Sequence, residues 1–209
     1  MNIFRTLLLG SACLVSATSA LATESADFRV TGVISPTPCT PLFDGIIDYG
    51  SIKAVDLNPV EHTQLAEKTL NYKILCGSRT TVSTTWTDAR SGTASDTPND
   101  YAFGLGLQGS NKIGKYFIEN AFDITADGTP INMVYKLSGS YDWQVGPDRR
   151  KFGTHTTHAY APNGTIEPGS YATITSSIKV NTYIAPTDDL DLSKAIELDG
   201  LATMTLRYL

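Results

Sequence analysis

The chain has 209 residues, of which 41% are hydrophobic and 18% are charged, and its formal net charge at pH 7 is −5. This mild negative charge argues against a nucleic-acid-binding protein, which would need a basic face. Beyond the amino end, no segment reaches the roughly 20 apolar residues of a membrane-spanning helix. The length suits one domain with its own hydrophobic core.

The first 22 residues have the pattern of a signal peptide. Arg5 precedes a mostly apolar run over residues 6–15, which is too short to span a bilayer. Small residues follow, and Ala20-Leu21-Ala22 fits a cleavage site, so we expect cleavage before Thr23. A cut after Ala20 is the alternative. The exported chain would then hold 15 Lys and Arg against 21 Asp and Glu, and residues 23–209 would form a single domain.

Cysteine usage agrees with export. Cys13 would leave with the signal peptide, so two cysteines remain, Cys39 and Cys76, 37 residues apart. An even number of cysteines in an exported chain indicates a disulfide. Closing a loop of this length stabilises the fold by about 4 kcal/mol in the chain-entropy model. Two buried free thiols are the alternative.

Apolar residues alternate with polar ones along most of the chain, between turns rich in Gly, Pro, Asn and Asp. This period of two predicts an all-β fold, because long helical patterns are absent. The predicted strands cover residues 28–34, 46–52, 69–76, 80–87, 103–107, 115–118, 131–137, 169–184 and 196–209. Loops are predicted over residues 58–68, 89–99 and 148–164, and tight turns at Asp127-Gly128 and residues 188–191.

The last predicted strand has one face suited to a core and continues to the carboxylate. The residues on that face are Ala202, Met204, Leu206 and Tyr208. Thr203, Thr205 and Arg207 point the other way. No turn or closing strand follows before Leu209. Such an edge is either an association hazard or a place that another chain fills.

Three motifs suggest ligand chemistry and are better explained structurally. Residues 104–109 fit G-x-G-x-x-G, but this dinucleotide-binding motif requires a strand, a helix and a parallel βαβ unit. We therefore interpret it as strand alternation with close backbone approach. His155 and His158 have no third metal ligand nearby in sequence and suggest a solvated loop. Residues 188–191 lack the glycine and closing glutamate of an EF-hand and indicate a turn. No nucleophile motif is present, so no enzyme, cofactor or metal is predicted.

Five segments, taken in order, resemble subunits of chaperone-usher fimbriae (pilins). Residues 30–39 (VTGVISPTPC) are similar to the family's first strand, with a glycine seven residues before the first cysteine. Residues 47–52 (IDYGSI) and 70–76 (LNYKILC) are similar to the next two strands, and residues 103–107 to a mid-chain strand. The terminal alternation, with Tyr208 second from last, resembles the family's assembly strand. Within the family, the poorly characterised β-type fimbrial subunits are the nearest.

The resemblance implies an immunoglobulin-like sandwich that lacks its last strand, with a Cys39–Cys76 disulfide between its first two strands. A periplasmic pilus chaperone lends the missing strand, an outer-membrane usher exports the subunit, and another fimbrial subunit then supplies a donor strand. The assembly strand would be Ala202, Met204, Leu206, Tyr208 and Leu209, and the donor segment would be Ala26, Phe28 and Val30 within residues 23–31. An additional strand or loop is expected between residues 143 and 199. The implied function is a structural subunit of a surface fimbria.

A binding module is the alternative function. A fimbrial-tip or secreted sandwich of this kind would recognise a surface receptor or a glycan. Aromatic side chains are the candidates for such a site: Tyr101, Tyr116, Tyr141, Trp143 and Tyr160. In a sandwich, however, aromatic residues more often belong to the core.

Overall fold

The computed structural model of the protein describes residues 24–34, 38–96, 99–146 and 150–209. The predicted signal peptide lies outside these residues. The chain divides into two units, which end at Ile34 and Leu209, and each is described here by itself. No helix in the described ranges is long and apolar enough to cross a membrane.

The second unit is built almost wholly from antiparallel strands, which confirms the predicted all-β fold. The longer strands are β1 (Cys39–Phe43), β3 (Lys68–Thr80), β4 (Val82–Asp88), β8 (Gly114–Asn120), β11 (Asn132–Leu137), β13 (Thr156–Ala161), β14 (Tyr171–Ile184) and β15 (Ala202–Tyr208). Two-residue strands are β2 (Thr63–Gln64), β5 (Phe103–Gly104), β6 (Leu107–Gln108), β7 (Asn111–Lys112), β9 (Thr125–Ala126), β10 (Thr129–Pro130) and β12 (Lys151–Phe152). The 3-10 turns are η1 (Ala54–Asp56) and η3 (Thr187–Asp189).

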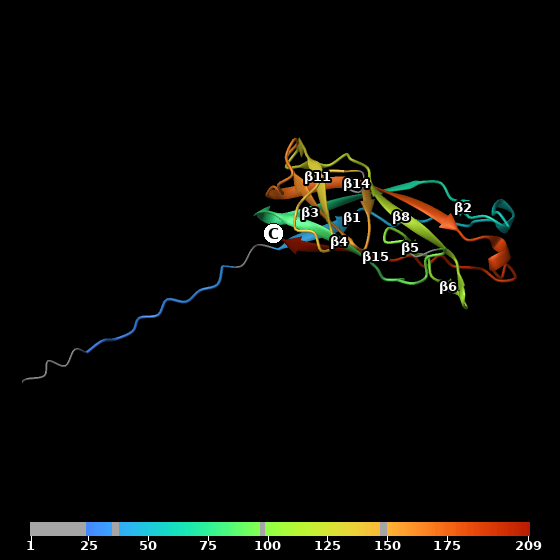
Figure 1. The fold of residues 1–209 in the computed structure, drawn as a ribbon, viewed down its shortest axis with the longest axis horizontal. Coiled ribbons are helices and arrows are strands. Elements are labelled where there is room, and N and C mark those ends of the chain that lie inside the picture. The colour runs from blue at the N-terminus through green and yellow to red at the C-terminus, as the bar shows by residue number, and fades with distance from the viewer. Residues whose placement is uncertain (1–23, 35–37, 97–98, 147–149) are drawn as a thin grey trace, which may run out of the picture. The chain divides into compact units, whose positions relative to one another are not determined.

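The strands form two main sheets (Figure 1). The larger has the order β1-β3-β14-β8-β12, with β14 paired along most of its length to β3 on one side and β8 on the other. The smaller has the order β11-β13-β4-β15. Both sheets contribute apolar residues to a shared core, and in the smaller sheet Val134, Ala159 and Ala161 form a second buried cluster with Trp143.

The strand order is that of an immunoglobulin-type sandwich. Such a sandwich places strands A, B, E and D in one sheet and C, F and G in the other. Here β1, β3, β14 and β8 take the places of A, B, E and D, while β4 and β15 take those of C and F. No strand of the described residues occupies the place of G beside β15. Within the described residues, the sandwich therefore lacks the strand that the sequence predicts to be missing.

The core lies between the two sheets. Tyr72 and Ile74 of β3 are almost fully buried, and so is Tyr160 of β13 from the opposite sheet. The hydroxyls of Tyr72 and Tyr160 lie 3.2 Å apart and share a hydrogen bond, which satisfies two polar atoms that burial would otherwise leave unpaired. This half of the core is therefore filled by side chains of the two sheets themselves.

The predicted disulfide is present. Cys39 and Cys76 are joined, and they are directly opposite each other in the pairing of β1 with β3. The bridge therefore ties an edge strand, which has a neighbour on one side only, to the body of the sheet.

Two predicted strands do not form. Residues 28–34 and 46–52 are neither helix nor strand. In the first of these segments Phe28, Val30 and Ile34 are all more than four-fifths exposed. Both segments have strand-like sequences, but a strand exists only where a neighbour accepts its backbone hydrogen bonds. In the described part of the chain, neither segment has such a neighbour.

A strand also forms where a loop was expected, within residues 148–164. Here β13 pairs with both β11 and β4. His158 is fully buried in β13, with its ring centre 4.8 Å from that of Phe152, so the solvated-loop interpretation is wrong for this residue. His155 is exposed, and its ring lies 3.2 Å from Asp100. The described residues contain no cluster of potential metal ligands.

The remaining motifs have structural roles. Asp127 and Gly128 both have positive φ values, 49° and 80°, and join β9 to β10 in a tight hairpin. Gly104 lies where a Cβ atom would meet the carbonyl oxygen of Arg90 at 2.7 Å, which is the close approach predicted for the glycine-rich segment. Residues 188–191 follow the expected turn at η3.

Candidate functional site

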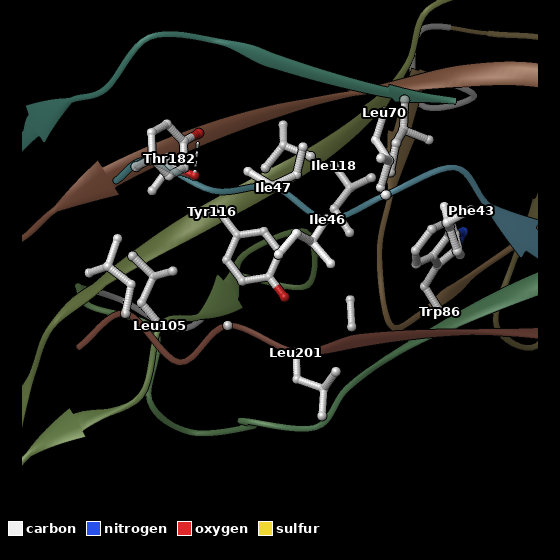
Figure 2. A pocket seen from close by; sticks show the side chains of 17 residues that line it. Phe43, Ile46, Ile47, Leu70, Trp86, Leu105, Tyr116, Ile118, Thr182 and Leu201 are labelled. Atoms are coloured by element: carbon white, nitrogen blue, oxygen red, sulfur yellow. Dashed lines mark hydrogen bonds between the residues drawn. The ribbon is translucent and has the colours of Figure 1, made fainter. Parts of the chain in front are cut away.

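An open apolar groove lies beside β15, where the two sheets stand apart. One wall is the irregular segment after β1, and the other is the chain leading into β15 (Figure 2). The lining is Phe43, Gly45, Ile46, Ile47, Tyr49, Leu70, Trp86, Leu105, Tyr116, Ile118, Ile178, Val180, Thr182, Leu198, Gly200, Leu201 and Ala202. Its volume of about 350 Å³ is more than twice the ~150 Å³ of a large engineered cavity in a protein core.

A second hollow continues the groove away from Phe43. It shares Ile47, Tyr49 and Leu198 with the first and has a volume of about 580 Å³. Its walls are residues 47–52 on one side and residues 194–198 on the other. The two hollows therefore follow the same pair of chain segments. Together they make an elongated groove rather than a round pocket.

Both rims of the groove carry unpaired backbone groups. β15 pairs with β4 on one side and with no strand of the described residues on the other. Along residues 45–52, the only backbone group with a hydrogen bond in the described part is the Gly50 N–H, which bonds to Asp48. Two rims with free N–H and C=O groups, separated by an apolar floor, are what an inserted strand requires.

Tyr208, at the end of β15, is tied to the beginning of β1. Its hydroxyl accepts a hydrogen bond of 2.9 Å from the backbone N–H of Cys39. This contact joins the end of β15 to the beginning of β1, which carries the disulfide. The sheets thus meet at the Cys39 end and separate beyond Phe43.

The wall that leads into β15 is held from outside the groove. The guanidinium of Arg90 donates two hydrogen bonds of 2.7 Å to the carboxylate of Asp199. These bonds hold the pKa of Asp199 below its usual value. Further back along the wall, Gln108 and the backbone of Asp191 exchange two hydrogen bonds. The wall therefore keeps its place without a ladder to a neighbouring strand.

Four side chains with polar atoms lie in this apolar lining. The hydroxyl of Tyr49 donates to Oγ1 of Thr182 at 3.0 Å and is satisfied. The hydroxyl of Tyr116 points into the space between the walls (Figure 2) and has no hydrogen bond within the described part of the chain. The indole N–H of Trp86 is also buried without a partner there. The groove thus contains hydrogen-bond donors that the chain itself does not satisfy.

The predicted assembly strand forms, but its residues have different positions. Ala202 lines the groove. Met204 is buried, and Leu206 packs against the core from a half-buried position. Tyr208 contacts Cys39, and the N–H of Leu209 donates to the carbonyl of Thr81. Instead of lining the groove together, the five residues anchor the strand that bounds it.

The predicted donor segment lies in the first unit. Ala26, Phe28 and Val30 are exposed, and the residues around them form no helix or strand. The segment offers apolar side chains at alternate positions, in keeping with the sequence prediction.

Four of the five aromatic residues of the alternative binding site lie in different surroundings. Tyr116 lines the groove and Tyr160 is in the core. Trp143 packs with a small separate cluster, under the ammonium of Lys136. Tyr141 is 94% exposed.

Most residues of the groove were not predicted as site residues. The signal was present: Ile46 directly precedes the segment at residues 47–52 that resembles a family strand, and Ile47 begins it. Tyr116 and Ile118 share one face of β8. What the sequence does not reveal is that these faces have no internal partner, since buried and unfilled apolar faces have the same pattern.

Part of the chain is similar to a known family. The family model described as "Protein of unknown function (DUF1120)" matches residues 28–105. This stretch carries both cysteines and the Ile46 wall of the groove but not β15.

Two relatives come from Escherichia coli (strain K12). "Uncharacterized protein YhcF" is 26% identical over 243 aligned positions, which span 100% of both chains. "Protein GltF" is 27% identical over 238 positions, which span 93% of each. None of these descriptions mentions a fimbria, so the fimbrial role is a proposal.

Proposed function

We propose that the protein is a structural, non-enzymatic subunit of a bacterial surface fimbria that assembles by donor-strand complementation. After export by its signal peptide, a periplasmic chaperone holds it, and an usher in the outer membrane adds it to the fibre. In both complexes a strand from another chain fills the groove beside β15.

The observation that carries this proposal is the open groove with unpaired backbone on both rims. An ordinary exported sandwich would fill the position beside β15 with its own last strand. Here no strand of the described residues takes that position, and Ile46 and Leu201 in the groove lining are 84% and 47% exposed. Apolar side chains of this size gain about 1.5–3 kcal/mol each when buried, so a strand with several inward residues would stabilise the fold substantially.

The segment at residues 24–34 supports the complementary role. It has apolar side chains at alternate positions and no secondary structure. In a fibre, the protein would insert this segment into the groove of one neighbouring subunit and receive a strand from another in its own.

A fused donor strand tests the proposal. A strand with alternating apolar residues, joined after Leu209 through a short flexible linker, should convert an aggregation-prone chain into a stable monomer. Size-exclusion chromatography and urea unfolding would measure the change. The matched control is the same fusion with charged residues at the inward positions, which should not rescue the monomer.

A stable, monomeric chain without any donor would contradict the proposal, and so would equal rescue by both fusions. In cells, electron microscopy should show fewer or altered fibres when the gene is deleted, with recovery on complementation.

A further inference from the structure

The hydroxyl of Tyr116 makes the groove selective as well as apolar. Tyr116 is 7% exposed, and its ring stacks on Phe103 with centres 5.4 Å apart. On the other side, a Cβ atom at Gly200 would lie 2.9 Å from the ring. The ring is therefore fixed, and its hydroxyl points into the groove (Figure 2). Within the described residues this hydroxyl has no hydrogen-bond partner.

The hydroxyl is a donor under all ordinary conditions. Burial, and next the negative charge of Asp88, raise the pKa of Tyr116 well above its usual value, while Arg90 opposes them. An inserted strand with only aliphatic inward residues would seal this donor away from water without an acceptor. Leaving a buried donor unpaired is costly.

Resting on the proposed function, we infer that the strand that fills this groove carries a neutral hydrogen-bond acceptor, such as Thr, Ser or Asn, at the inward position facing Tyr116. A carboxylate fits less well, because the carboxylate of Asp88 is 7% exposed nearby and an apolar groove disfavours a second charge. The partner strand is thus mostly apolar with one polar inward residue.

This requirement bears on which chain donates the strand. The segment of this protein places Ala26, Phe28 and Val30 on one face, and none of their side chains has an acceptor. A second copy of this chain is therefore a poor match for the groove. The matched donor comes from a different subunit, which makes Tyr116 a specificity-determining residue for the order of assembly.

A scan of the fused donor tests the inference. The host donor after Leu209 has valine at every inward position, and each valine is replaced in turn by threonine, which has nearly the same shape. At one position threonine should raise the thermal midpoint by about 2–4 °C, the shift expected for one hydrogen bond in a chain of this length. Asparagine there should also be tolerated, and aspartate should lower the midpoint.

Tyr116→Phe in the same fusions should reverse the preference, so that threonine lowers the midpoint relative to valine. Tyr49→Phe is the matched control, because its hydroxyl already bonds to Thr182 and its removal should shift all donors equally. If Tyr116→Phe does not fold, the scan in the chain that retains Tyr116 still shows whether one inward position prefers threonine to valine.

If the valine donor gives a higher thermal midpoint than threonine at every inward position, the inference is wrong. The proposed function would not be affected. Failure of the all-valine host to stabilise the chain at all would overturn both.

Discussion

Around Tyr72 and Tyr160 the two sheets close on each other, whereas around Ile46 and Leu201 they stand apart. Tyr72 and Tyr160 are each 1% exposed, and their hydroxyls satisfy each other. Ile46 is 84% exposed, and Tyr116 has no partner within the described residues. Apolar and aromatic residues occur in both regions of the sequence. The difference shows that apolar residues indicate which face of a segment can be buried. Whether that face is buried depends on a neighbouring strand that covers it.

The disulfide provides the largest test of the closed half. Changing Cys39 and Cys76 together to serine should lower the free energy of unfolding by about 4 kcal/mol, because the loop between them is no longer closed in the unfolded chain. Urea unfolding of the donor-fused protein would measure the loss. Free thiols detected by mass spectrometry in natively purified protein would contradict the pairing.

A matched pair of substitutions distinguishes the closed core from the open groove. Ile74→Ala should cost about 2–5 kcal/mol with or without a donor strand, since it opens a cavity in the closed core. Ile46→Asp should leave the unfilled chain within about 0.5 kcal/mol of its original stability. In the donor-fused protein it should cost about 1.5–3 kcal/mol. Equal effects of Ile46→Asp in both forms would mean that no strand covers Ile46.

A smaller loss of stability is expected when the hydrogen bond between Tyr208 and Cys39 is removed. Tyr208→Phe keeps the ring but removes the acceptor for the Cys39 N–H, so it should cost about 0.5–1.5 kcal/mol. Hydrogen exchange at the Cys39 amide should become faster. An unchanged exchange rate would show that this hydrogen bond does not hold β15 to β1 in solution.

The smallest effect concerns pH. Burial opposes the charge of Asp123, but hydrogen bonds from Ser177 and Ser176 outweigh it and lower its pKa. The stability from these bonds is therefore fully present above the unfolded pKa of about 3.9 and is lost as the pH falls through the folded value. Asp123→Asn should show a weaker loss of stability between pH 5 and pH 2, measured by urea midpoints. Asp142→Asn, at a residue without a hydrogen bond in the described part, is the control.

The sequence predicted the framework better than the edges. Strands β3 and β8 were recognised because their buried faces alternate, and β4 and β14 because they are rich in β-branched residues. β11 was also predicted, although three consecutive residues, Met133, Val134 and Tyr135, are buried in it. The prediction of a strand over residues 46–52 was wrong, because the alternation of residues gives no information about whether a neighbouring strand is present. β13 was missed because its buried residues include Thr156 and His158, which have the pattern of a polar loop.

The site was predicted only in outline. The edge strand and the disulfide follow from residue types and spacing, and both are present. β15 starts at Ala202 rather than near residue 196, because Asp199 bonds to Leu105 and Arg90 instead of extending the ladder with β4. Which residues face the groove depends on such local contacts, and no periodic pattern encodes them.

The contact between Tyr208 and Cys39 also has a kinetic consequence. These residues are 169 positions apart in the chain, and Arg207 meets Ser83 across 124 positions. Contacts between such distant positions close slowly, because a long loop must be ordered before they form. β15 is thus among the last strands to find its place, and β4 has an open edge until then. The chain is therefore prone to aggregate already during folding, before a donor strand enters the groove.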